Sequence, residues 1–269
     1  ISCLKDLSRE GLVKLGEHGG YIDPDDLLLT GKSFTVDESA PTDSELVIFN
    51  DMSVPYYYFL EGENDCIDCV VESLVPTIQE MEEQLSRYIN TNLEACLGDF
   101  SSLTPQGYDV DPLSEVKTLT YISESDVRFL TNYSLHITKE GQSEEINQFF
   151  VKSDIPLKKY YSLAIEIAKK QSETMFLENF MLLLIDYYSG VDAKKLPPLY
   201  DIQEGHSYVI WSKYLVQKNI EQLLMSYLPL FQIEGTRNFH PLEIESDSPA
   251  EESFYNALSL SFWEPTYPE

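Results

Sequence analysis

Residues 77–97 carry the clearest structural signal in this sequence, because their apolar residues recur on one face of an α-helix. Thr77 and Glu80 stand in the pattern of a capping box, which satisfies free amide groups where a helix starts. The apolar face consists of Ile78, Met81, Leu85, Tyr88, Ile89, Leu93 and Cys96. A helix of this kind is stable when its apolar face packs on a core, so the rest of the chain must supply one.

Three other segments also predict helices. Residues 2–17 place four leucines at helical spacing, at positions 4, 7, 12 and 15. Pro156 opens a long helix that runs to about Tyr188, since proline is well tolerated in a first helical turn. A further helix spans about 213–227.

Residues 115–153 predict a three-stranded antiparallel meander with short turns at 123–126 and 139–144. In its middle strand the apolar side chains alternate, which places them on one face: Val127, Phe129, Tyr133, Leu135 and Ile137. We therefore expect an α+β fold, with this sheet covered by helices at 77–97 and 156–189.

The order of elements indicates two regions in the chain of 269 residues. Residues 1–110 form an N-terminal helical region held by disulfides. Residues 111–269 form an α+β region with the meander, the long helix, a C-terminal helix and further strands. The alternative is a single continuous domain, for which the hydrophobic content of 43% is sufficient.

The charge balance restricts the classes of partner. Forty-six acidic residues against eighteen basic ones give a net charge of −28. Nucleic acids and anionic lipids bind proteins through Lys and Arg, so we expect no nucleic-acid partner and no direct binding of the membrane surface. The acidic surface suits a cationic partner, divalent cations, or solubility alone.

The four cysteines favour disulfides, because their number is even and the chain starts at Ile1 in the manner of a processed protein. We expect Cys3 to pair with Cys96 and Cys66 with Cys69. Four cysteines allow three pairings, and the sequence alone does not choose among them.

Catalytic signatures are missing from the sequence. It has no nucleophile elbow, no P-loop, no dinucleotide-binding glycine motif and no zinc-protease motif. The histidines are far apart, at positions 18, 136, 206 and 240. We therefore name no catalytic, cofactor-binding or metal-binding residue, and an enzymatic role is less expected than a non-enzymatic one.

Two local patterns nevertheless have a chemical reading. Cys66-Ile67-Asp68-Cys69 is expected to be a structural disulfide, since nearby acidic residues disfavour a reactive thiolate. Zinc binding together with Cys3 and Cys96, or redox activity, are the alternatives. Carboxylates also cluster at 23–26, 61–65 and 109–111, where oxygen ligands suit Ca²⁺, although none has EF-hand spacing.

Four segments together resemble uncharacterised membrane-anchored surface proteins of small-genome (DPANN) archaea. They are CLKDLSREGLVKLGEHGGYID at 3–23, VPYYYFLEG at 54–62, VPTIQEMEEQLSRYINTNLEACL at 75–97 and FFVKSDIPLKKYYSLAIEIAKKQ at 149–171. The resemblance covers most of the chain, contains no catalytic motif, and supports pairing of Cys3 with Cys96. It implies a location outside the cytoplasm, with an N-terminal hydrophobic anchor before the first helix.

These observations lead to two hypotheses of different class. The first is an extracellular or cell-surface ectodomain with a structural or protein-interaction role, in adhesion or in the envelope, through a protein partner or self-association. The alternative is an extracellular hydrolase that uses acidic residues or a bound divalent cation. A flat or aromatic patch favours the first hypothesis. A deep pocket with convergent carboxylates and a metal favours the second.

Overall fold

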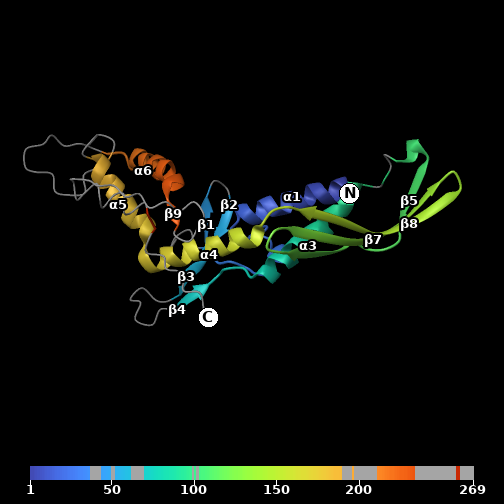
Figure 1. Ribbon diagram of the computed structural model, residues 1–269, viewed down its shortest axis with the longest axis horizontal. Coiled ribbons are helices and arrows are strands. Elements are labelled where there is room, and N and C mark those ends of the chain that lie inside the picture. Colours follow the sequence, from blue (N-terminus) through green and yellow to red (C-terminus); the bar gives the residue numbers. More distant parts are fainter. Residues whose placement is uncertain are drawn as a thin grey trace, which may run out of the picture. The chain divides into compact units, whose positions relative to one another are not determined.

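A computed structural model gives the architecture of the chain (Figure 1). The structure describes residues 1–36, 44–49, 52–61, 70–98, 100, 103–189, 196, 211–233 and 259–260. The chain divides into two compact units, Ile1–Ser172 and Glu173–Glu269. Helices and antiparallel sheets together make this an α+β protein, as predicted.

The first unit contains most of the regular structure. Its helices are α1 (Ser2–Glu17), α2 (Leu27–Thr30), α3 (Ile78–Leu97) and α4 (Leu157–Thr174), the last of which runs two residues past the boundary. Its strands are β1 (Leu46–Phe49), β2 (Met52–Pro55), β3 (Tyr58–Glu61), β4 (Val70–Ser73), β5 (Tyr108–Pro112), β6 (Lys117–Ile122), β7 (Val127–Lys139) and β8 (Gln142–Ser153).

The boundary between the units lies after the sheet rather than near residue 110. The reason is a shared core: α1, α3 and strands β6 to β8 all contribute buried side chains to one cluster. The N-terminal helices and the meander are therefore parts of the same unit.

Strand β7 is the centre of the main sheet. β8 pairs with it along one edge, and β6 and then β5 pair with it along the other, all antiparallel. The expected meander is thus present, and β5 extends it beyond the predicted limits. The hairpin between β7 and β8 turns at Glu140 and Gly141, which both adopt positive φ.

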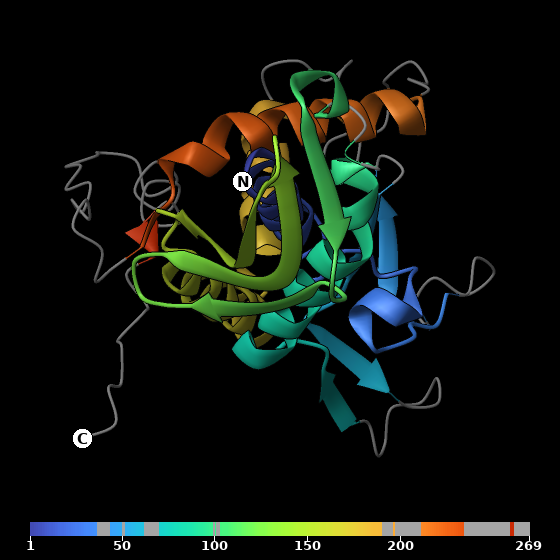
Figure 2. The ribbon, with the colours of Figure 1, turned by 90° about the vertical axis from the view of Figure 1, so that its right-hand side faces the viewer.

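One face of this sheet is buried against α1 and α3, as Figure 2 shows end-on. On β7 the buried side chains follow the predicted alternation, with Thr131 added to the series: Val127, Phe129, Thr131, Tyr133 and Leu135. We expected 156–189 to cover the sheet together with 77–97. Instead α1 takes that place, and of α4 only the region of Leu157 and Tyr161 packs on the core.

Helix α3 begins as its sequence predicts. The Thr77 hydroxyl accepts the Glu80 N–H at 3.2 Å, and the Glu80 carboxylate accepts the Thr77 N–H at 2.6 Å. Its apolar face packs along α1, whose leucines at 4, 7, 12 and 15 are all buried. Each helix stabilises the other because neither could bury its apolar face alone.

Polar side chains of α3 also close the free edge of β6. The acceptors are Glu82, Ser86 and Asn90, spaced four residues apart on one face of the helix. They take the N–H groups of Ile122 at 2.7 Å, Thr120 at 3.1 Å and Thr118 at 2.7 Å, in that order. Helix α3 thereby stands where another strand would otherwise pair, and the edge is not available for aggregation.

A further polar residue of α3 holds the segment after α1. The Gln84 side chain is fully buried, accepts the Ile22 N–H at 3.0 Å and donates to the Gly20 carbonyl at 3.5 Å. Gly20 has φ of +96°, and a Cβ there would lie 2.6 Å from Cγ of Pro76. Glycine is therefore required at this position.

The predicted long helix from 156 to about 188 is two helices in the structure. Helix α4 ends at Thr174 and α5 (Phe176–Ser189) begins after Met175, whose φ of +47° is incompatible with a continuous α-helix. The apolar spacing continues across this residue, so the sequence pattern alone does not reveal the break.

The second unit is small in its described part. It contains α5, α6 (Lys213–Tyr227) and a parallel pair of short strands, β9 (Gln232–Ile233) and β10 (Ser259–Leu260). Phe180 and Leu184 of α5 form its core, and the hydroxyls of Tyr188 and Tyr227 are hydrogen-bonded. The sequence also predicts a short strand around Tyr208–Trp211, which lies mostly outside the described residues. No helix in the described part of the chain is both long and apolar enough to cross a bilayer.

Because α3 closes the edge of β6, alanine substitutions at two adjacent glutamates of this helix should differ strongly in how much they destabilise the fold. Glu82→Ala should lower the free energy of unfolding by about 1–3 kcal/mol, because the buried Ile122 N–H loses its acceptor. Glu83→Ala, which removes an exposed ion pair with Arg87 and an exposed hydrogen bond from Gln79, should cost less than about 1 kcal/mol. Equilibrium denaturation of the two variants measures both, and equal effects would contradict the assigned role of Glu82.

Candidate interaction surface

The structure joins Cys3 of α1 to Cys96 of α3 in a disulfide, with Cα atoms 5.8 Å apart. This is the pairing expected for these two residues, and it links the start of the first helix to the end of the third. Because it closes a loop of 93 residues, it restricts the unfolded chain strongly and contributes up to about 4–5 kcal/mol. Cys66 and Cys69 lie outside the described residues.

The carboxylates at 23–26 have structural partners. Asp26 caps α2 by accepting the Leu28 N–H at 2.8 Å, and Asp23 accepts the Asp25 N–H at 3.1 Å. Asp25 in turn accepts the Ser53 hydroxyl at 2.7 Å. These side chains support a turn and a helix start, which accounts for their clustering without a bound cation.

The other candidate ligands form no metal site where the structure describes them. Asp109 and Asp111 are exposed on β5, while Glu63 and Asp65 lie outside the described residues. His18 makes a 2.7 Å hydrogen bond to the Ser53 carbonyl, and the histidines at 206 and 240 are not among the described positions. Within the described ranges no group of three His, Cys, Asp or Glu side chains is placed to hold a metal ion.

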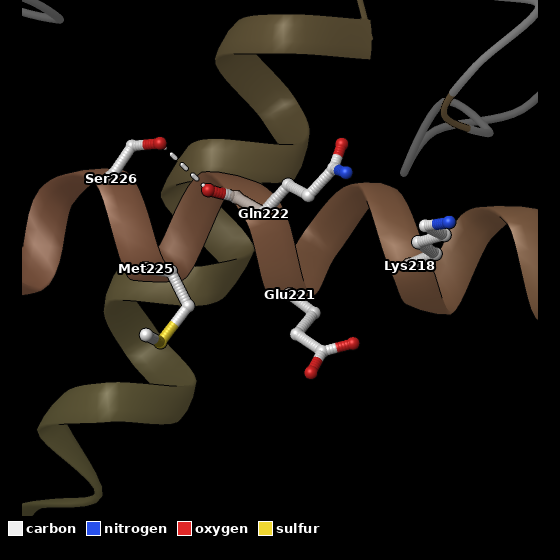
Figure 3. A pocket seen from close by; sticks show the side chains of 5 residues that line it. All are labelled: Lys218, Glu221, Gln222, Met225 and Ser226. Atoms are coloured by element: carbon white, nitrogen blue, oxygen red, sulfur yellow. Dashed lines mark hydrogen bonds between the residues drawn. The ribbon is translucent and has the colours of Figure 1, made fainter.

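A shallow depression on α6 does not have the character of a substrate site. It is lined by Lys218, Glu221, Gln222, Met225 and Ser226, all of them exposed (Figure 3). The side chains of Glu221 and Met225 point to one side of the helix and that of Gln222 to the other. Ser226 donates to the Gln222 carbonyl of its own helix at 2.8 Å, so its hydroxyl is already used.

The three tyrosines of the VPYYYFLEG segment, Tyr56 to Tyr58, could stack on a sugar or a partner protein only where their rings are exposed, and they are partly packed. Tyr56 is 41% exposed, whereas Tyr57 and Tyr58 are half-buried. Burial, reinforced by the neighbouring Tyr161, raises the pKa of the Tyr57 phenol above its ordinary value. This segment therefore offers one exposed ring and no aromatic platform.

Strand β6 shows the reverse of the usual burial pattern for a surface strand. Its threonines Thr118 and Thr120 face the interior, each 5% exposed, while Leu119 and Tyr121 face outward at 51% and 52%. An antiparallel sheet with one solvated face normally turns its polar residues outward. Here the buried threonines are satisfied by hydroxyl partners, namely Thr131 at 3.0 Å and Ser86 at 2.9 Å.

The outward residues of β6 continue into an apolar row across the sheet. Leu119 lies opposite Leu130 of β7, and Leu130 lies opposite Phe150 of β8, which is 55% exposed. The row is flanked by Lys117, Asn132 and Gln148 on one side and by Tyr121, Arg128 and Lys152 on the other. We call these nine positions the outer patch. None of the nine is acidic and three are basic, in a chain with 46 acidic and 18 basic residues.

A buried carboxylate organises the basic corner of the outer patch. Asp126 is only 4% exposed and lies 2.8 Å from Nε of Arg128 and 3.4 Å from Nζ of Lys152. The hydrogen bonds from Arg128 and Ser123 lower the pKa of Asp126 from 3.8 to about 2. Asp154, exposed beyond the end of β8, also binds Lys152 at 2.6 Å.

The same face of the sheet changes character beyond the β7 bulge near Ser134. There Asp111, His136 and Glu145 lie side by side on β5, β7 and β8. The outer face therefore has an apolar half, which is the outer patch, and a polar half rich in carboxylates. Two of the three basic residues of the outer patch, Arg128 and Lys152, are paired with Asp126 and Asp154. Large exposed apolar residues bordered by polar ones are typical of contact surfaces between proteins.

The outer patch is not evident from the sequence alone. Its apolar members come from three strands, and only the pairing register brings them together. Residues Lys117 to Ile122 alternate in the sequence, which assigns successive side chains to opposite faces of a strand. This alternation alone does not show which of the two faces is buried.

Comparisons with protein-family models, with curated protein sequences and with solved structures find no match to this chain.

The hydrogen bonds and ion pairs of Asp126 predict that the stability of the fold decreases in acid. Because its pKa is lowered in the fold, the ionised carboxylate stabilises the folded chain above about pH 4, and this contribution disappears as the pH falls toward about 2. Asp126→Asn should therefore be less stable than the unmodified chain at neutral pH, and the difference should shrink across that acid range. Urea denaturation over a pH series measures this, with Asp154→Asn as the exposed control. A difference that stays constant with pH would contradict the assignment.

Proposed function

We propose that this chain is an extracytoplasmic, cell-surface ectodomain with a structural or protein-interaction role. The observation that carries the proposal is the inverted burial of β6, which presents Leu119 and Tyr121 to solvent while threonines occupy the core. Placing apolar residues outside and polar ones inside costs folding free energy unless something covers the outer face. A protein partner in an envelope or adhesive contact would supply that cover.

The Cys3–Cys96 disulfide supports a location outside the cytoplasm. Structural disulfides persist in oxidising compartments and are rare where cellular reductants keep thiols reduced. The resemblance to archaeal surface proteins points to the same location. A net charge of −28 suits a cell-surface protein that must remain soluble and avoid nonspecific association.

Protease treatment of intact source cells tests the location. Trypsin added outside should digest this chain while a cytoplasmic control protein of the same cells stays intact. After acid quenching and thiol alkylation, peptides containing Cys3 and Cys96 should be recovered joined to each other. If the chain resisted digestion until lysis and both thiols were alkylated, the proposed location would be wrong.

A further inference from the structure

We propose that the side-chain amide of Asn132 is the attachment site of an N-linked sugar chain. The inference rests on the proposed extracytoplasmic location, because this linkage is made on exported chains, and it adds a covalent modification to that role. Its starting point is the tripeptide Asn132-Tyr133-Ser134, which has the acceptor pattern Asn-X-Ser/Thr. No other asparagine of the sequence is followed by Ser or Thr two positions later.

A tripeptide of this kind also arises by chance, so its place in the fold decides whether it can carry a sugar. Thr131 and Tyr133 point into the core, at 0% and 3% exposed, and Asn132 between them is exposed on the outer face. Its neighbours across the sheet, Lys117 of β6 and Gln148 of β8, are exposed as well. A sugar chain on Asn132 would therefore extend into solvent without displacing a core side chain.

The tripeptide lies where β7 departs from regular pairing. After Asn132, the two residues Tyr133 and Ser134 stand opposite a single residue of β8, which is a β-bulge. The Ser134 N–H donates to the Ser114 hydroxyl at 2.9 Å, and the Ser134 carbonyl accepts the Leu113 N–H at 2.8 Å. These two bonds use the backbone of Ser134 and not its hydroxyl, which is the group that the acceptor pattern requires.

The amide of Asn132 can accept a sugar and keep its contact in the fold. Its Oδ1 accepts a hydrogen bond from Nε2 of Gln148 at 3.0 Å, and Nδ2 is the atom that the sugar would take. The transfer joins Nδ2 to C1 of the first sugar and breaks the bond from C1 to the phosphate oxygen of a lipid-linked donor. The lipid phosphate leaves and Nδ2 loses one proton. Because Oδ1 is unchanged, the bond from Gln148 persists in the product.

The surroundings of Asn132 suit a sugar. Its diagonal neighbours on the outer face are Leu119 and Phe150, each just over half exposed, and such neighbours lie about 7–8 Å apart. The C–H groups of the first sugar can pack on these side chains, because positively polarised C–H groups are attracted to the face of an aromatic ring. Lys117 and Gln148 can donate hydrogen bonds to the sugar hydroxyls. The sugar chain would then form part of the surface that a protein partner meets.

Mass spectrometry of the chain purified from its source cells tests the site. The peptide that contains Asn132 should exceed its sequence mass by a series of sugar units, and fragmentation should place them on Asn132. In the same cells Ser134→Ala should lose the added mass completely, whereas Ser134→Thr, which keeps a hydroxyl, should retain it. Both variants keep the backbone bonds of the bulge, and thermal unfolding shows that each is folded.

The matched control is Asn147→Gln, which changes an exposed asparagine outside any acceptor tripeptide and should leave the added mass in place. An unmodified Asn132 in a chain that external trypsin digests would overturn the inference, make the tripeptide a chance occurrence, and leave the proposed location intact. Added mass that persists in Ser134→Ala would overturn it as well. Resistance to trypsin until lysis, together with an unmodified Asn132, would overturn both proposals.

Discussion

The hydrogen bonds between α3 and the edge of β6 are the constraint on which the rest of the first unit depends. Four residues of an α-helix rise about 6 Å, and two residues of a strand rise nearly 7 Å. Glu82, Ser86 and Asn90 can therefore meet alternate amides of β6 without distortion of either element. Each buried amide left without an acceptor would cost about 1–3 kcal/mol, so this register of helix against strand is strongly favoured.

Once α3 is fixed against β6, the remaining contacts of the unit follow from its other faces. Its apolar face buries the leucines of α1, the Cys3–Cys96 disulfide ties the two helices together, and Gln84 holds the glycine turn after α1. The inner face of the sheet is thereby buried against α1 and α3. On the opposite face Leu119 and Phe150 are exposed and Leu130, between them, is half-buried. That face is the basis for the proposed interaction role.

Local sequence patterns predicted the parts of the fold that local physics determines. The capping box of Thr77 and Glu80, the leucines of α1 and the alternation in β7 all appear in the structure as expected. Polar residues were less informative, because Glu82 and Asn90 look like solvent-facing helix positions until β6 is placed beside them. The helix break at Met175 depends on a single backbone conformation. The outer patch depends on register, which no single segment encodes.

Hydrogen exchange of the β6 amides tests the central role of α3 most directly. In an ordinary edge strand, amides that point away from the sheet exchange quickly with solvent. If α3 closes this edge, the amides of Thr118, Thr120 and Ile122 should be protected to a degree similar to those of the central strand β7. Exchange of these three amides at the rate of an unstructured chain, while β7 stays protected, would contradict the account.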